Sequence, residues 1–419
     1  MIRSRIFYGW WVTAAFSVMV FVSAGVRHAV GPFLKPMVAD LGVDRGSFSL
    51  VIALALFLYG AYMPWVGVLV DRFGARVVTS AGAVILAGSL AATGLCHNLW
   101  QLALVYGATA SLGLAATGPV VANAVVSRWF HRHRGTAVSM LGSAAMTGMS
   151  LLVPLVAWMI VHVGWRMTYA SIGLFVLLVM LPMCLFVVRD EPEALGLASD
   201  GDPVPAEGTA VGALERTPVG EAMQTVAFWQ LALSFLTCGF SMSLLSAHGV
   251  PMLTDHGYTS IFASWVFGVL GGSSILFTVM LGTASDRFGR RPVLASIYAR
   301  RALVFAGFFL IRDNPTAILA VAVHGGITMA GTGSMTSALT ADIYGRFSVS
   351  SVFGLIFIVH QTGAATGSWL AGALFESTGG YGAAFTVACM FLVAASIVAL
   401  NIDHGARRIW RPATAGAAD

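Results

Sequence analysis

The sequence is poor in charge and almost without lysine. Charged residues make up 10% of the 419 residues, whereas a soluble domain has about 25%. Lys35 is the one lysine among 23 basic residues, so the other 22 are arginines. Hydrophobic residues make up 58% of the chain, and the mean hydropathy is +0.83. This composition excludes an ordinary soluble domain and indicates a protein that lies largely in a lipid bilayer.

Cysteine is also scarce, and the spacing of the cysteines indicates neither a metal site nor a redox site. The four cysteines have no metal-ligand or redox spacing, and we interpret them as small apolar packing residues: Cys96, Cys184, Cys238 and Cys389. The sequence also has no nucleophile triad and no phosphate-binding loop. We therefore expect no enzyme activity, no metal and no cofactor.

Long apolar runs dominate what is present. Each is close to the roughly 20 residues that a membrane-spanning helix needs, and helices are the structure that satisfies backbone groups in lipid. The sequence thus predicts an all-α membrane protein of twelve transmembrane helices. We place them near residues 8–30, 47–70, 77–96, 100–127, 136–162, 167–188, 226–252, 261–284, 293–311, 315–341, 350–375 and 382–402.

The basic residues between these helices are unevenly placed. With the N-terminus inside, the outer loops hold only Lys35, Arg45, Arg166 and Arg312, and most other arginines are cytoplasmic. This asymmetry predicts that both termini are cytoplasmic in a multi-pass protein of the cell's inner (plasma) membrane. It also accounts for the basic balance without a nucleic-acid partner.

One polar stretch interrupts the hydrophobic pattern. Residues rich in Gly, Pro, Asp and Glu follow the sixth predicted helix, with Asp200-Gly201-Asp202-Pro203 at the centre. Such a composition is typical of a flexible linker. We predict a six-helix bundle at 1–188, a cytoplasmic linker at 189–224, and a second bundle with a short cytoplasmic tail at 225–419.

A short charged sequence occurs twice, in corresponding places. The pattern Gly-x-x-x-Asp-Arg-Phe-Gly-x-Arg occupies 67–76 and again 282–291, and we call these two segments the charged seams. Glycine would let two helices approach closely, and the aspartate could lie against the positive N-terminus of a neighbouring helix. We expect the seams to bias one of two conformations, through Gly67, Asp71, Arg72, Gly74 and Arg76 and through Gly282, Asp286, Arg287, Gly289 and Arg290.

An internal repeat around a central site is a feature of secondary transporters, and this chain resembles the major facilitator superfamily over its whole length. Four further segments are similar to its monocarboxylate transporter and oxalate:formate antiporter branch: 7–11, 128–137, 164–166 and 189–197. The resemblance implies two pseudo-symmetric six-helix bundles with a substrate path between them, working by alternating access.

Apart from tyrosines and cysteines, the ionisable groups inside the predicted helices are arginines and histidines. No Asp or Glu lies in the middle of a span, so a buried-carboxylate proton relay has no candidate. Burying a charge in hydrocarbon costs free energy, so an ionisable residue inside a membrane span is a candidate functional residue. Arg27 and His28 lie in helix 1, and the resemblance places His28 and Lys35 where monocarboxylate carriers have lysines. It likewise places His360, beside Gln361, where oxalate:formate antiporters have an anion-contacting lysine.

Other polar residues are candidates for the same path. His248 precedes Gly249 and Pro251, which we expect to break helix 7 near a gate or a site. Tyr106, Asn123 and His324 could contribute hydrogen bonds to the cargo. We expect Arg300 and Arg301 to snorkel or to face a protein interface. The chain departs from the branch at Thr278 and Ser274, where the resemblance expects an arginine and an aspartate, so Arg27 could supply the missing charge.

These observations favour a secondary transporter that is monomeric. Its expected cargo is a small organic anion, a carboxylate above all, moved as a symporter with protons or as an antiporter by exchange. An efflux carrier for amphipathic drugs or metabolites is the alternative within transport. A membrane sensor that does not transport is the alternative of another class.

Overall fold

The computed structural model describes residues 7–130, 133–197, 217–311, 313–329, 331–344 and 349–403. Most of the predicted linker, 198–216, and the end of the chain after residue 403 lie outside this description, so the predicted bundle boundaries stay a prediction. Several side chains also lie outside it, including four that the sequence singled out: Asp71, Thr278, Gly282 and Asp286.

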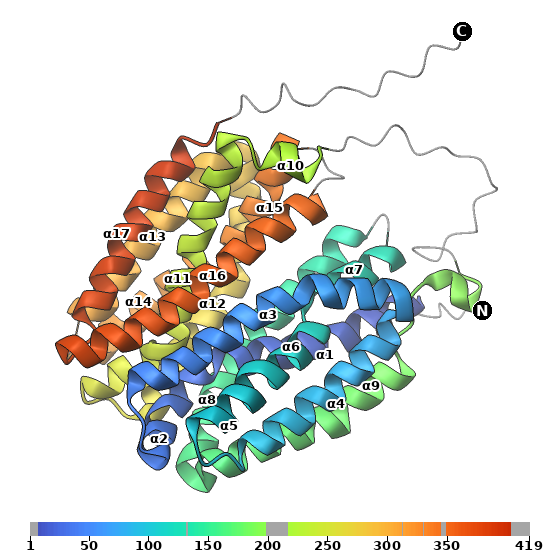
Figure 1. Ribbon diagram of the computed structural model, residues 1–419. Helices are drawn as coiled ribbons and strands as arrows, with labels where there is room; N and C mark the ends of the chain where they lie inside the picture. The colour runs from blue at the N-terminus through green and yellow to red at the C-terminus, as the bar shows by residue number, and fades with distance from the viewer. Residues whose placement is uncertain are drawn as a thin grey trace.

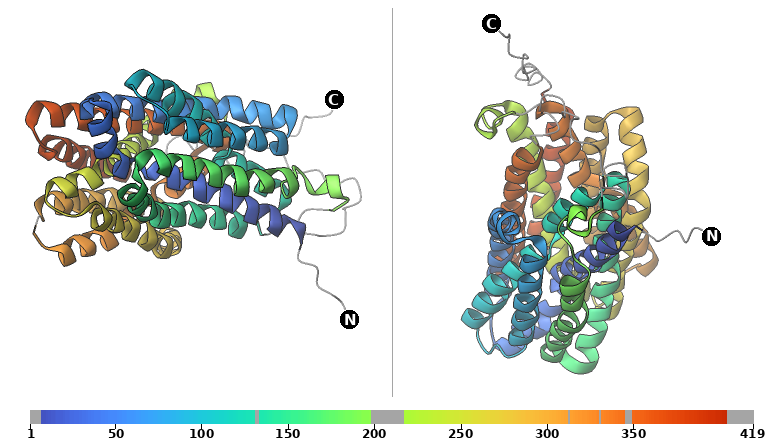
Figure 2. Two further views of the ribbon diagram at one scale, coloured as in Figure 1. Left: turned by 90° about the horizontal axis from the view of Figure 1, so that it is seen from below. Right: turned by 90° about the vertical axis from the view of Figure 1, so that its right-hand side faces the viewer.

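The described residues form helices and no strand. Two groups of helices diverge from one another in Figure 1, and Figure 2 shows the same groups from below and from the side. The first group comprises α1 (Tyr8–His28), α2 (Val30–Leu41), α3 (Arg45–Phe73), α4 (Ala75–Thr93), α5 (Leu99–Leu102), the π-helical η1 (Ala103–Ala110), α6 (Ser111–Ala116), α7 (Pro119–Trp129), α8 (Arg134–Phe175), the π-helical η2 (Val176–Met180) and α9 (Leu181–Phe186).

The second group follows the linker. A short 3₁₀ turn, η3 (Pro192–Leu195), lies just after the first group. The second group comprises α10 (Val219–Ala222), α11 (Val226–Asp255), α12 (Ser260–Phe288), α13 (Arg290–Leu310), α14 (Pro315–Met329), α15 (Gly331–Tyr344), α16 (Val349–Thr378) and α17 (Gly382–Leu400).

The prediction of twelve membrane-crossing helices is confirmed. Ten segments of the described residues are long and apolar enough to cross a bilayer, and one of them, Thr136–Phe186, has 51 residues. This segment contains two helices that meet at Gly164, whose φ of 80° interrupts the helical backbone. A further pass is α16, a helix of 30 residues whose centre carries the polar His360 and Gln361. The described residues therefore hold twelve passes.

The two charged seams have the same backbone geometry. Gly74 joins α3 to α4 at φ 83° and ψ 153°, and Gly289 joins α12 to α13 at φ 86° and ψ 151°. Residues with a Cβ rarely adopt such a positive φ, which explains glycine at both positions. In each copy an arginine also lies over the ring of the phenylalanine after it: Arg72 over Phe73 and Arg287 over Phe288.

The groups meet through α3 against α16 and through α8 against α12. Close backbone approach requires glycine in these contacts: a Cβ on Gly60 would meet Gln361, one on Gly372 would meet Ser49, and one on Gly268 would meet the carbonyl of Ser150. These contacts run from the end of the molecule opposite the termini to its middle. Beyond the middle the groups diverge, as Figure 1 shows.

Candidate functional site

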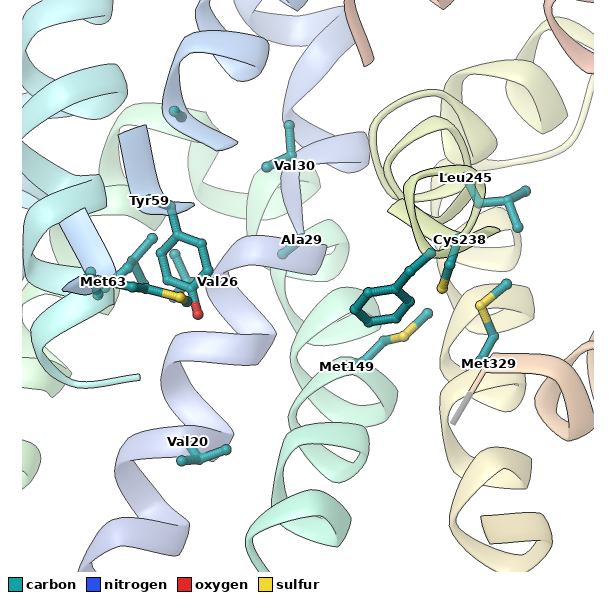
Figure 3. Close-up of a cluster of buried hydrophobic side chains, with 14 of the residues drawn as sticks. Val20, Val26, Ala29, Val30, Tyr59, Met63, Met149, Cys238, Leu245 and Met329 are labelled. Carbon is teal, nitrogen blue, oxygen red and sulfur yellow. The ribbon is translucent and has the colours of Figure 1, made fainter. Parts of the chain in front are cut away.

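A cavity of about 280 Å³ lies between the two groups of helices, halfway along them. Figure 3 shows buried side chains of this part of the molecule, with Tyr59 and Val26 on one side of the view, Cys238 and Met329 on the other, and Met149 between them. The side chains that give the cavity its chemistry come from α1, α11, α15 and α16: Arg27, His28, Cys238, Ser243, Ser246, Thr332, Ser334, His360 and Gln361. No carboxylate lies among its lining residues.

The first group contributes the cation of the cavity. Arg27 is half-buried, and its guanidinium lies 5.1 Å from the centre of the Tyr59 ring. This cation–π contact orients the guanidinium without neutralising it, and none of the ion pairs among the described residues includes Arg27. His28 is buried beside it, and its Nδ1 has no hydrogen-bond partner there. Both side chains predicted for helix 1 thus line the cavity with polar groups available.

The second group contributes an oriented histidine. The Nδ1 atom of His360 lies 2.8 Å from Oε1 of Gln361, and the Gln361 amide nitrogen donates to the Leu56 carbonyl at 3.4 Å. An amide oxygen only accepts, so Nδ1 of His360 carries the hydrogen and Nε2 is left for other partners. The ring stacks on Phe357 and lies tilted against Phe235. Gln361 thereby fixes His360 and also links α16 to α3.

A side chamber of about 20 Å³, large enough for one water molecule, opens behind Arg27. Its lining includes Arg27, Tyr59, Ser111 and Tyr106. Tyr106 lies in η1, and π-helical turns are frequent at functional sites. Its ring packs edge-on to Tyr169, 5.9 Å between centres. Tyr106 therefore backs the Arg27 side of the cavity and does not line the main volume.

His248 lies in a closed contact between the two groups, away from the cavity. The expected break in its helix is wrong, because α11 continues through Gly249 and Pro251 to Asp255. A proline inside a helix removes one backbone hydrogen bond, but the buried packing of α11 retains the helix. The predicted gate residue is therefore part of a continuous helix.

Hydrogen bonds define how His248 is held. Arg45 donates to the Tyr381 hydroxyl at 2.9 Å, and this hydroxyl lies 3.2 Å from Nδ1 of His248. Nε2 of His248 lies 2.9 Å from the Ser368 carbonyl, which can only accept. Nε2 thus carries the hydrogen, and Nδ1 accepts from Tyr381. Burial raises the pKa of Tyr381 to about 12, so its hydroxyl keeps the proton that it donates.

Ion pairs close the end of the molecule opposite the termini. Asp255 of α11 accepts from Arg45 of α3 at 2.7 and 3.2 Å, and it also pairs with Lys35 of α2 at 2.6 Å. Glu376 accepts from the backbone N–H of Arg45 at 2.9 Å. Asp44 caps α3, and its hydrogen bonds with Ser47 lower the pKa of that carboxyl. All these contacts except the cap join one group to the other, so the cavity is sealed at this end.

Besides Tyr106 and His248, two further predicted site residues do not line the cavity. Asn123 is exposed on α7, and His324 is half-buried on α14 without lining either cavity. Ser274 is buried and donates to the Leu270 carbonyl, so it is absent from the lining as well. The sequence gave no signal of the direction in which these side chains point.

Sequence reasoning missed a pair of residues at the cavity wall. Cys238 lines the cavity and lies 3.1 Å from a guanidinium nitrogen of Arg301, so it is not the simple packing residue that we expected. Arg301 is fully buried, whereas Arg300 is exposed. Adjacent helical residues point about 100° apart, and the sequence alone does not tell which of the two faces inward.

The seam glycine of α3 does not pack against another helix in this conformation. A Cβ added to Gly67 would meet nothing within 4 Å, and the same holds for Gly354 on α16. The expected close approach at Gly67 is therefore absent in this conformation, because Gly67 lies beyond the middle of the molecule, where the two groups of helices diverge. A carboxylate does lie at the N-terminus of α4, as expected for a seam, but it belongs to Asp190, which accepts from the N–H groups of Ala75 and Arg76.

In the second seam, Arg290 joins the turn to α15. It donates to the Ala338 carbonyl at 2.8 Å and forms an ion pair with Asp342.

Known proteins share this architecture. The sequence model of the Major Facilitator Superfamily matches residues 16–261 and 231–417. The chain belongs to the major facilitator superfamily. It is thereby a multi-pass membrane protein of a transporter superfamily, as the seams and the hydropathy pattern predicted.

Individual relatives cover almost the whole chain at low identity. An uncharacterized MFS-type transporter, YcxA of Bacillus subtilis, is 24% identical over 93% of this chain and 94% of its own. Monocarboxylate transporter 13 of Bos taurus is 26% identical over 95% and 90%. The oxalate:formate antiporter of Oxalobacter formigenes is 24% identical over 90% and 87%. The second and third of these relatives carry the names of the branch that the sequence resembled.

The fold matches a solved structure of this superfamily. A bacterial homologue of the human lysosomal transporter Spinster, in an inward-facing and unoccupied conformation, superposes with a TM-score of 0.70 at 16% identity. The superposition covers 96% of this chain and 98% of the other. At this identity the likeness shows the fold alone.

Removing the carboxylate of Asp255 is expected to open the sealed end. The change Asp255→Asn leaves Lys35 and Arg45 without their shared counter-charge. Charge-assisted hydrogen bonds contribute about 1.5–3 kcal/mol each, so we expect the equilibrium to shift by about tenfold toward the conformation open at this end. Spin labels at the exposed Ala39 and Ser377 would report the change as a longer distance.

The matched control is Asp40→Asn. Asp40 also pairs with an arginine at this end, Arg166 at 2.8 Å, but both belong to the first group. Its removal should leave the label distance unchanged. An equal shift in both variants would mean that net charge, and not the link between the groups, controls closure.

Proposed function

We propose that this protein carries a small organic anion, most simply a monocarboxylate, across the cell's inner membrane by alternating access. The observation that supports this is the composition of the cavity: Arg27, His28 and His360 line it, and none of its lining residues is acidic. A buried cation without a counter-charge is costly, and an anionic cargo would neutralise it. The relatives named for monocarboxylates and for oxalate and formate belong to the same branch.

The size of the cavity favours a small cargo over a drug. Pockets for drug-sized ligands measure about 300–1,000 Å³, and this cavity of about 280 Å³ lies just below that range. Its apolar wall, formed by residues such as Met242, Met329 and Phe357, suits the hydrocarbon part of a carboxylate. Efflux of amphipathic drugs is the second candidate, and the methionines favour it because they adapt to varied shapes.

Thermal stability in the presence of ligands tests the proposal. A ligand that binds only the folded protein at 100 times its Kd stabilises it by about 2.7 kcal/mol. We expect the purified protein to be stabilised by at least one member of a panel of short and aromatic monocarboxylates, and not by the matching amides. Stabilisation by neutral or cationic amphipaths alone would favour the drug carrier. A protein that binds a carboxylate but moves none in liposomes would be a sensor.

We further propose that both termini are cytoplasmic, which makes the present conformation open to the cytoplasm. The basic residues described earlier support this orientation. The sealed end with Arg45 and Asp255 would then face outward.

Uptake is expected to rise as the outside becomes acidic. The cavity has no carboxylate to carry a proton, and histidine is the side chain whose charge ordinarily changes between pH 5 and 8. If one proton accompanies each anion, uptake should fall by up to about tenfold per pH unit above the titration midpoint. Flux measured across this range, with and without a proton gradient, checks the expectation. Flat flux under both conditions would leave exchange or uniport.

A further inference from the structure

Arg301 is a buried cation with no acidic partner among the described residues. It lies on α13 and is completely buried. Its guanidinium donates to Sγ of Cys238 at 3.1 Å, to Oγ of Ser241 at 3.3 Å and to the Thr328 carbonyl. Its Nε has no partner in the described part of the chain. Dipoles alone compensate an ionised group in a dry interior poorly, so a nearby counter-charge would stabilise Arg301.

The counter-charge nearest to hand is the thiol of Cys238. Of the groups that accept from the Arg301 guanidinium, it alone can lose a proton to become an anion. The other ionisable groups that face this thiol are Tyr298 of α13 and His360 of α16. Tyrosine ordinarily gives up its proton at higher pH than cysteine. Thr332 of α15 adds a hydrogen bond to Sγ at 3.0 Å.

The thiol also faces the cavity. Cys238, Thr332 and His360 all line it, and Figure 3 shows Cys238 and Met329 on neighbouring helices at its wall. The backbone of His360 packs against Gly239, the residue after Cys238, and the His360 ring lies 4.3 Å from that of Phe235, one helical turn before Cys238. Because Nδ1 of His360 is held by Gln361, Nε2 is the nitrogen that can exchange a proton with Sγ. The imidazole of His360 and the thiol of Cys238 thus both face the cavity, and the thiol contacts the guanidinium of Arg301 behind it.

We propose that Cys238 and Arg301 form a thiolate–guanidinium ion pair in the cavity wall, and that this pair takes up the coupled proton through His360. The proton moves from Nε2–H of the His360 imidazolium to Sγ of Cys238, and a proton that enters the cavity from the solution outside reprotonates Nε2 of His360. The thiolate becomes a thiol, and the positive charge of Arg301 is left without its counter-ion. A cargo carboxylate beside Cys238 and Thr332 then neutralises that charge, so one proton and one anion occupy the cavity together.

This inference rests on the proposed carriage of an organic anion, but the ion pair can be tested without a cargo. A thiolate absorbs in the far ultraviolet where a thiol does not. The experiment compares the purified full-length protein with Cys238→Ser and records the difference spectrum between pH 5 and 8. We expect the signal of one thiolate at neutral pH and its loss on acidification. No thiolate at neutral pH would overturn the proposal.

Two further variants test whether the thiolate signal depends on the positive charge of Arg301. In Arg301→Gln the thiolate signal should be absent at neutral pH, and in Arg301→Lys, which keeps the charge, it should persist. The same signal in Arg301→Gln would overturn the pairing, and if that variant does not fold, the wild-type spectrum and the lysine variant decide. Cys184→Ser is the matched control, because Cys184 is buried against Met19. Its removal should leave the signal unchanged.

Transport measurements distinguish this proposal from the one on which it rests. Cys238→Ser cannot ionise in this range, so uptake of a carboxylate by this variant should lose its acid stimulation. A thiolate signal in a protein that binds no carboxylate would refute the cargo and keep the ion pair. Acid-stimulated uptake that persists in Cys238→Ser would refute the proton route and keep the cargo.

Discussion

A leucine at position 67 or 354 is expected to stop transport while the protein stays folded. Gly67 lies on α3 and Gly354 on α16, and in this conformation both have open space where a side chain would be. Leucine can therefore be accommodated here without a clash. The effect should appear only when α3 and α16 close against one another at the end of the molecule where the two groups of helices now diverge.

The register of the two helices shows why they would meet. Gly60 lies against Gln361, and Ser49 lies against Gly372, so the antiparallel contact advances equally along both helices. Seven residues beyond Gly60 is Gly67, and seven residues before Gln361 is Gly354. Seven residues are about two helical turns, so both glycines lie on the faces already in contact. Closing the gap brings one directly opposite the other.

Overpacking costs about 1–3 kcal/mol per site, so each variant should lower the closed population by about five- to 150-fold. Gly88→Leu is the matched control, because Gly88 is exposed on α4 with nothing within 4 Å but has no helix to meet. Initial rates of flux, with melting temperature as the check on folding, give the measurement. Normal flux in Gly67→Leu and Gly354→Leu would mean that these helices do not close as their register implies.

Removal of either Arg27 or His360 is expected to weaken anion binding strongly. In Arg27→Ala the first group loses its guanidinium, and in His360→Ala the second group loses the imidazole that Gln361 orients. Truncating one partner of a buried hydrogen-bonded charge pair costs about 2–5 kcal/mol, which corresponds to about thirtyfold or more in Kd. Binding of the carboxylate found in the thermal screen, measured by calorimetry, gives the values.

The chain offers a control for each residue type. Arg300→Ala removes an exposed arginine of α13, and His324→Ala removes a histidine outside the cavity lining. Both should bind the anion like wild type. Wild-type affinity in Arg27→Ala and His360→Ala would refute the site, whereas loss in His360→Ala alone would keep the cavity and discard Arg27. The double variant tests whether the two residues act on the same anion.

The sequence predicted the fold because the signals that specify it are local. Twenty-residue apolar runs predict each helix wherever it packs, and glycine at positions 74 and 289 marks turns that need a positive φ. His360 was predicted from a resemblance and Arg27 from its charge alone, and both line the same cavity. For these two residues, the polar side chain that the sequence singled out also faces the cavity.

The rest depended on which way each side chain points. Arg301 and Cys238 are on different helices, and no local pattern indicates that they touch. Asn123 is polar and lies on a predicted path helix, yet it is exposed. Pro251 predicted a helix break that does not occur, since a proline near a helix end loses only one hydrogen bond and tertiary packing can retain the helix. Contacts between helices, which the sequence pattern does not encode, decide all three cases.

Flux of a carboxylate through purified protein in liposomes tests the central claim most directly. Vesicles loaded with an unlabelled monocarboxylate are diluted into the labelled one, and counterflow is recorded for wild type and for the Arg27→Ala/His360→Ala double variant. We predict saturable counterflow in wild type that the double variant lacks, while Arg300→Ala/His324→Ala retains it. Counterflow of neutral or cationic compounds alone, or equal counterflow in both double variants, would contradict it.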